Sequence, residues 1–176
     1  MATLTSKKRK PSAATSPDPG VHVGVPRMPA MYQGKKREKF LPWSHAEERL
    51  ARSRNYWICT SRADGRPHSA PVWGLWHDGA LYFGTHRDSR KARNIARNPH
   101  VSIHLESGDD VVIIEGAVEE VDQKAVARQL DAACRKKYRM PMSVMPESVC
   151  FRVRPRVVLA WTEADFPNNS TRWEFP

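Results

Sequence analysis

The sequence predicts a mainly β domain, a small antiparallel β-barrel with a few short helices, and three observations predict it. Short runs of β-branched and aromatic residues begin at Tyr56 and are separated by tight-turn sequences such as Ala63-Asp64-Gly65. The longest run, residues 149–161, has an apolar residue at every second position, which is typical of a strand with one buried face. Six or seven such strands fit into about 130 residues with only a few helices between them, the pattern of a small barrel.

The N-terminal half of the domain is expected to hold one helix and three short strands. Ser44 followed by Glu47 is a capping-box pattern, which predicts that the helix begins at Ser44. Pro71 and Gly74 interrupt the second strand. Because proline cannot complete a ladder of hydrogen bonds, this strand is expected at a sheet edge or locally broken. The tight turns predict an antiparallel meander with strands at residues 56–61, 67–76 and 80–85.

The C-terminal half is expected to alternate helices with longer strands. Ser89 predicts the start of a short helix, which Asn98-Pro99 ends. Gly116 predicts a β-bulge and Pro155 a bend in the long strand. The other elements are expected as strands at residues 100–106, 111–121 and 170–175 and a helix at 123–138.

Residues 1–42 have the composition of a disordered leader. They hold nine of the 29 basic residues, two of the 19 acidic residues and six of the 14 prolines. Such a segment buries too little apolar area to offset its ordering entropy, so the folded domain is expected to span residues 43–176. Because the charge lies in this leader and not on a folded face, a solvated leader is favoured over a nucleic-acid-binding protein. Removing residues 1–42 is then expected to leave stability unchanged.

Length and composition also exclude several classes of protein. The chain of 176 residues is long enough for one domain with its own core. No apolar run approaches the roughly 20 residues of a membrane helix, and the first residues lack the apolar stretch of a secretory signal. The three cysteines lie far apart in the sequence and favour neither a disulfide framework nor a zinc site. We therefore expect a cytoplasmic protein without a metal centre or a membrane partner.

The segment from Thr85 to Lys91 is the most informative about function. It leaves a strand, crosses a polar loop and opens a helix at Ser89. A helix N-terminus offers free backbone amides and the positive end of the helix dipole, while Arg90 and Lys91 add fixed charge. The segment therefore predicts a phosphate-binding site, with an ordinary N-capped surface helix as an equally weighted alternative.

The second strand, Ser69 to Gly74, predicts a place for a flat polar ring. An exposed strand edge has free carbonyls and amides that can bond a heterocycle, and Gly74 and Gly84 allow a close approach. A bulged strand without a ligand fits the same residues. The histidines are scattered and no nucleophile motif accompanies them, so catalytic residues stay unassigned and the chemistry is expected to come from a cofactor.

In their order and spacing these motifs resemble the pyridoxamine 5'-phosphate oxidase-like FMN-binding split-barrel family, which includes flavin/deazaflavin oxidoreductases. The resemblance runs from residue 43 to the C-terminus. It rests on Asp64-Gly65-Arg66-Pro67, Ala70-Pro71-Val72-Trp73, Leu81-Tyr82-Phe83-Gly84-Thr85, Ser89-Arg90-Lys91, Asn94-Ile95, Asn98-Pro99-His100-Val101 and Glu115-Gly116. It implies a six-stranded, antiparallel, Greek-key-like split barrel, and a homodimer that holds FMN or coenzyme F420 at the subunit interface.

The resemblance also implies roles for individual residues. The strand Ser69 to Gly74 would face the isoalloxazine ring, and Arg90 and Lys91 would hold the phosphate. Trp161 and Arg172 match residues that contact the cofactor from the partner subunit. The full set of expected cofactor-binding residues is Ser69, Ala70, Pro71, Val72, Trp73, Gly74, Gly84, Thr85, Ser89, Arg90, Lys91, Trp161 and Arg172.

The substrate motif of the oxidase itself is absent from this sequence. Val111 stands at the position that matches a glutamine of the oxidase, and residues 168–173 stand where the oxidase has Arg-x-His-Asp-Arg. The terminal Arg172-Trp173-Glu174-Phe175 is closer to the deazaflavin branch. The resemblance thus implies an FMN- or F420-dependent oxidoreductase that transfers a hydride to or from a small organic substrate. A non-catalytic carrier of flavin, F420 or haem is the alternative.

Overall fold

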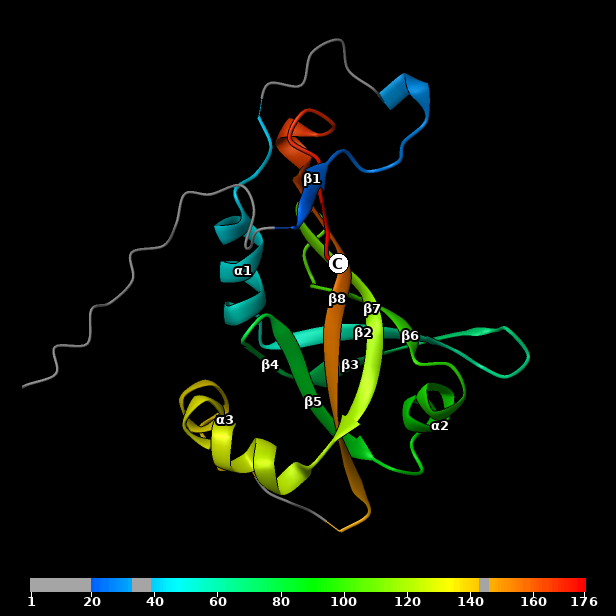
Figure 1. Cartoon of the computed structure of the whole chain (residues 1–176), viewed down its shortest axis with the longest axis vertical. Helices are drawn as coiled ribbons and strands as arrows, with labels where there is room; N and C mark the ends of the chain where they lie inside the picture. Colours follow the sequence, from blue (N-terminus) through cyan, green and yellow to red (C-terminus); the bar gives the residue numbers. More distant parts are fainter. Residues whose placement is uncertain (1–19, 33–38, 143–145) are drawn as a thin grey trace, which may run out of the picture.

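A computed structural model describes residues 20–32, 39–142 and 146–176, and these form a mainly β domain (Figure 1). Their strands make one antiparallel sheet in the order β1-β9-β8-β7-β6-β2-β3, with β5 joining β8 and β4 joining β5. In Figure 1 β7 and β8 run upright while β2, β3 and β6 cross them, so the sheet curls around the core. The elements are β1 (His22–Gly24), η1 (Ala30–Tyr32), α1 (Trp43–Arg52), β2 (Asn55–Ser61), β3 (Pro67–Trp73), β4 (Leu75–His77), β5 (Ala80–His86), α2 (Arg90–Arg97), β6 (His100–His104), β7 (Asp110–Val121), α3 (Gln123–Tyr138), β8 (Ser148–Thr162), η2 (Glu163–Asp165) and β9 (Thr171–Glu174).

The predicted fold class is confirmed: the sheet is antiparallel and open, as in a split barrel. The described residues hold nine strands, however, where six or seven were expected. Two of the additional strands are very short, since β1 and β4 have three residues each. Strands of this length carry too little periodic sequence to be predicted.

The three α-helices lie close to their predicted positions. Ser89 caps α2 as expected, because its hydroxyl accepts a hydrogen bond from the Ala92 amide at 3.2 Å. The predicted capping box of α1 is wrong: the helix begins one residue earlier, Pro42 precedes it, and Ser44 already lies inside the first turn. No helix in the described part of the chain combines the length and apolar composition that a bilayer span requires.

The sheet splits where the second predicted strand is interrupted. β3 pairs with β2 alone among the described strands, which confirms its place at an edge. The chain breaks at Gly74, and β4 then pairs with β5. The predicted meander is therefore confirmed only in part: the end of the predicted second strand, Leu75 and Trp76, pairs with β5, but the longer pairing of β5 is with β8. A Cβ at Gly74 would lie 2.9 Å from a methyl group of Leu81, so only glycine lets the chain cross β5 this closely.

The long hairpin of β7 and β8 contains the predicted bulge. Its register shifts between Glu115 and Gly116, and Gly116 lies opposite Pro155. A Cβ on Gly116 would collide with the carbonyl oxygen of Arg154, which explains why glycine occupies this position. The bulge bends the hairpin and so helps to close the sheet around the core.

The hydrophobic core brings together residues from early and late elements of the chain. Trp173 in β9 is fully buried, and Trp43 in α1 packs against it edge-to-face at 5.4 Å between ring centroids. Tyr56 and Phe83 fill the same cluster from β2 and β5. A second, smaller cluster lies under α3 and includes Leu130. Burial of these large aromatic groups is the main source of the fold's stability.

The structure differs from the expected disordered leader at residues 20–32. β1 pairs antiparallel with β9, with Val23 opposite Trp173, and both Val21 and Val23 pack against the core. The composition of residues 1–42 as a whole did not reveal this strand, because it has only three residues and its partner β9 lies near the C-terminus. The basic cluster Lys7–Lys10 and residues 33–38 lie outside the described residues.

Two truncations should therefore behave differently. Removing residues 1–19 should leave the free energy of unfolding unchanged, because their sequence is rich in lysine, proline and serine and offers little apolar area to bury. Removing residues 1–32 should lower it by about 2–3 kcal/mol, since β9 loses its partner strand and Val23 no longer covers Trp173. Urea denaturation of the two variants beside the full chain measures the difference. Equal stability of all three proteins would show that β1 contributes nothing.

Candidate functional site

A buried chain of hydrogen bonds fixes the start of α2 against the edge strand. α2 packs on β2 and β3. The amide of Asn94 donates to the Thr60 hydroxyl at 2.9 Å, and this hydroxyl donates to the carbonyl of His68 at 3.3 Å. Asn94 and Thr60 are both buried. The contact holds the basic N-terminal turn of α2 beside the first half of β3.

Four cationic or titratable side chains meet at this junction: Arg62, His68, Arg90 and Lys91, called here the cationic cluster. Burial, together with the charges of Arg62, Lys91 and Arg90, lowers the pKa of His68 below its usual range. Within the described chain, Arg62 Nε and His68 Nδ1 are buried atoms without a hydrogen-bond partner. The nearby carboxylate of Asp64 instead pairs with the exposed Arg66 at 2.7 Å. Asp64 also lies close enough to Arg62 for the Arg62 charge to lower its pKa, but among the described residues no ion pair joins the cluster to a carboxylate. The cluster therefore has an excess of positive charge at the surface, which suits an anion.

The hydroxyls of Thr85 and Ser89, predicted for the phosphate site, form hydrogen bonds within the loop and the helix start. Thr85 Oγ1 donates to Ser89 Oγ at 3.1 Å, and Ser89 caps α2. Gly84 is exposed on β5, opposite Cys150 of β8. The structure thus brings Thr85, Ser89, Arg90 and Lys91 together at one helix start, as the sequence predicts.

The exposed face of β3 carries half of the residues expected to meet a ring. Ser69, Pro71 and Trp73 are exposed, while Ala70 is half-buried. The Val72 side chain belongs to the core, so only its backbone could reach a ligand. Because side chains alternate along a strand, His68 belongs to the other face of β3, on which α2 docks through Thr60. The edge of β3, and not this exposed face, therefore links the cationic cluster to Trp73.

Trp73 forms a supported aromatic surface at the end of β3. Its ring is 48% exposed and stacks on Tyr138 at 4.8 Å between centroids and 14° between planes. The Arg54 guanidinium lies 5.1 Å from the Trp73 centroid. Tyr138 also binds both backbone groups of Gly74, through hydrogen bonds of 2.8 Å. This support fixes Trp73 in an orientation that presents an aromatic surface to solvent.

Trp161 and Arg172 lie in another part of the molecule. Trp161 is opposite Val111 in the β7–β8 pair and packs against Phe166. Arg172 is opposite Leu159 and forms an ion pair with a glutamate two residues further on. In Figure 1 this end of β8 and β9 lies at the top, whereas α2 lies near the bottom. A single chain therefore does not bring these two residues to the cationic cluster.

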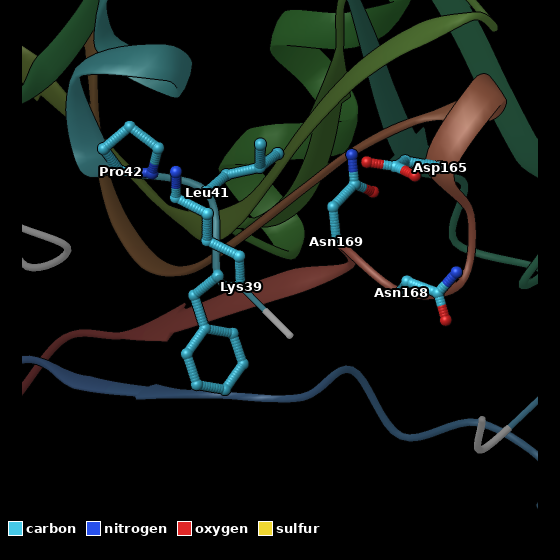
Figure 2. A pocket seen from close by; sticks show the side chains of 7 residues that line it. Lys39, Leu41, Pro42, Asp165, Asn168 and Asn169 are labelled. Carbon is cyan, nitrogen blue, oxygen red and sulfur yellow. The ribbon is translucent and has the colours of Figure 1, made fainter. Parts of the chain in front are cut away.

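Two cavities of the described chain lie outside this arrangement, one of them beside α2. One, of about 330 Å³, lies between α2 and the β7–β8 pair and is lined by residues that include Ala92, Arg93 and Phe151. The other, of about 750 Å³, lies beside the segment that precedes α1. Figure 2 shows Lys39, Leu41 and Pro42 on one side of this second cavity, and Asp165, Asn168 and Asn169 on the other. Neither cavity is lined by the cationic cluster, which lies at the surface of the chain.

Comparison with known proteins identifies the relatives of this chain. A sequence model of the pyridoxamine 5'-phosphate oxidase family matches residues 43–162. The chain belongs to the pyridoxamine 5'-phosphate oxidase family. This confirms the resemblance seen in the sequence, and the match begins at the first residue of α1. No curated protein matches the chain in a sequence search.

Solved structures of similar fold support the family assignment. An F420 reductase is 25% identical, with a TM-score of 0.53, and the match covers 64% of this chain and 94% of the reductase. The conserved hypothetical protein Rv2991 from Mycobacterium tuberculosis is 24% identical, with a TM-score of 0.63 and coverage of 73% and 89%. A FAD-binding protein (mll6688) from Mesorhizobium loti is 19% identical, with a TM-score of 0.54 and coverage of 88% and 99%. The split-barrel fold of this family member is thereby confirmed.

Sequence reasoning missed four residues of the candidate site. Arg62 and His68 flank the β2–β3 turn, and the pairing of Ser61 with Pro67 brings them near each other. That pairing was readable from the tight Ala63-Asp64-Gly65 turn, whereas the docking of α2 beside it was not. Tyr138 was missed because its spacing in the helix is that of an apolar, core-facing residue. Arg54 was missed because only its contact with the Trp73 ring places it at the site.

Proposed function

We propose that the protein is a cytoplasmic, homodimeric oxidoreductase that uses FMN or F420 to transfer a hydride to or from a small organic substrate. The observation that carries this proposal is the cationic cluster, which no ion pair neutralises among the described residues, at the beginning of the edge strand that ends in Trp73. The family match and the similarity to an F420 reductase support the same reading.

The cationic cluster fits the phosphate group of such a cofactor. A phosphate would supply the negative charge that the cluster lacks, and it would lie at the positive end of the α2 dipole. Arg90 and Lys91 would donate charge-assisted hydrogen bonds, each contributing about 1.5–3 kcal/mol. Arg62 would add a third cation from the β2–β3 turn.

The exposed face of β3 fits the ring of the cofactor. Its free edge offers backbone groups for hydrogen bonds to a planar heterocycle, and the exposed Pro71 and Trp73 offer apolar area. When bound, the cofactor supplies the hydride chemistry. The chain's own residues orient the ring and exclude water from one side of it. Trp161 and Arg172 of a second copy would complete the other side.

The cofactor that copurifies with the protein tests this proposal. The protein is purified from a host that makes both FMN and F420, and the absorption spectrum and mass of the bound molecule are recorded. A flavin or deazaflavin at about one per chain supports the proposal, and its absence even after loading with either cofactor contradicts it. Bleaching of the bound cofactor by a reductant, followed by recovery with an organic acceptor, distinguishes an oxidoreductase from a carrier. A carrier loads without substrate-dependent turnover.

A further inference from the structure

A cavity of about 330 Å³ separates α2 from the β7–β8 hairpin, and two faces of α2 explain why it is there. Asn94 lies on the face that docks on β2, where its amide donates to Thr60. Ala92 and Ala96 are four residues apart and share another face of the helix, and both line the cavity. Because alanine is small, this second face of α2 leaves open space in front of the hairpin.

The walls of this cavity are apolar. Five buried side chains of the hydrophobic core line it: Ala92 and Ile95 from α2, Val118 from β7, and Val149 and Phe151 from β8. Val149 and Phe151 are two residues apart in one strand, so they point to the same side of the sheet. The volume of the cavity lies at the lower end of the range of about 300–1,000 Å³ that is typical of small-molecule sites. The cavity therefore suits a short apolar group.

The rim of the cavity is charged, and one of its cations is available to a ligand. Arg87 forms a two-point ion pair with Glu120, with nitrogen–oxygen distances of 2.7 and 3.3 Å. Glu120 and, to a lesser extent, Asp88 raise the pKa of Arg87, so both carboxylates of the rim act on this one cation. Arg93 is exposed, and no carboxylate pairs with it in the described part of the chain. An anionic group can therefore bind Arg93 without breaking an existing ion pair.

We propose that this cavity binds medium-chain alkyl carboxylates. The alkyl tail lies against Val118, Val149 and Phe151, where it is removed from water. The carboxylate stays at the rim and binds the Arg93 guanidinium, whose planar fork matches the two carboxylate oxygens. The cationic cluster does not line this cavity, so the proposed cofactor and the carboxylate occupy different sites. This inference does not depend on the proposed cofactor.

Binding of octanoate to the full-length protein tests the proposal. Titration calorimetry compares octanoate with acetate, which has the carboxylate without the tail, and with 1-octanol, which has the tail without the charge. We expect octanoate to bind at least about tenfold more tightly than acetate, because its tail covers the apolar walls. In a nuclear magnetic resonance titration with octanoate, the amide shifts that change should include those of Ala92, Val118 and Phe151, which line the cavity.

Exposed positions of α2 provide variants that leave the core unchanged. Ala96→Phe places a ring in the cavity and should weaken octanoate and octanol alike, by at least about tenfold. Arg93→Gln should weaken octanoate about three- to fivefold and leave octanol unchanged, because a surface ion pair contributes little. Arg97→Gln is the matched control: it removes an exposed cation of the same helix that does not line the cavity, and both affinities should stay the same.

Thermal unfolding shows whether each variant is folded, and the unmodified chain provides a comparison that needs no variant. Octanoate that binds the unmodified chain no more tightly than acetate would overturn the proposal. Octanoate binding that Ala96→Phe does not weaken would place the ligand elsewhere and overturn it too. Equal effects of Arg93→Gln and Arg97→Gln on octanoate would contradict the role of Arg93.

Discussion

Replacing Arg90 and Lys91 together with alanine is expected to weaken the binding of FMN or F420 by about 100-fold or more. Both residues belong to the cationic cluster, which no ion pair neutralises in the described part of the chain. Removing two charge-assisted hydrogen bonds of about 1.5–3 kcal/mol each accounts for this loss. Because both side chains lie at the surface, the fold should not suffer. Titration calorimetry gives the dissociation constant, and thermal unfolding shows that the variant is folded.

The same helix supplies a matched control. Arg93→Ala removes one positive charge from α2, but Arg93 lines the cavity beside β7 and β8 and not the cationic cluster. Its dissociation constant should stay within about twofold of the wild-type value. Adding Arg62→Ala to the double variant should weaken binding further, which tests a residue that only the structure identified. An unchanged dissociation constant in the double variant would remove the cluster from the cofactor site.

The elements of the fold were predictable where they depend on residues close in sequence. Ser89 caps α2 because its hydroxyl reaches an amide three residues away. Gly116 indicated a bulge by its residue type alone, although the carbonyl that excludes a Cβ there belongs to Arg154 in the paired strand. The alternation of apolar residues in β8 and the stripe of α3 depend likewise on local periodicity alone. Patterns of this kind predict where a strand or helix lies.

Local sequence patterns do not predict which strand pairs with which, and the main errors in the predicted fold are errors of strand pairing. β5 pairs over three residues with β4, as the tight turn suggested, but its longer partner is β8, which lies about 70 residues further along the chain. The pairing of β1 with β9 joins the two ends of the chain. In the candidate site, too, local motifs were predictable and contacts between distant segments were not. Arg90 and Lys91 were predicted from a local motif, whereas Arg62 and His68 join them only because α2 docks on the β2–β3 hairpin.

The separation of Trp161 and Arg172 from the cationic cluster leads to a complementation experiment. The start of β8 borders α2, since Phe151 and Ala92 line one cavity, but Trp161 lies ten residues further along the strand. At about 3.3 Å per residue this is roughly 30 Å of strand. The proposed dimer would bring residues from both ends to one cofactor, with each chain contributing one set.

Two variants, Arg90→Ala/Lys91→Ala and Trp161→Ala/Arg172→Ala, should each bind cofactor poorly as homodimers. When both are coexpressed in equal amounts, half of the dimers should contain one chain of each kind. Each mixed dimer has one site with both wild-type halves and one site with neither, so tight binding should return at about a quarter of the sites. The control mixes the first variant with a chain that carries all four substitutions, which leaves no intact site. Recovery in the first mixture and none in the control requires a site shared between subunits. If neither mixture recovers tight cofactor binding, Trp161 and Arg172 do not contact the cofactor from the partner chain.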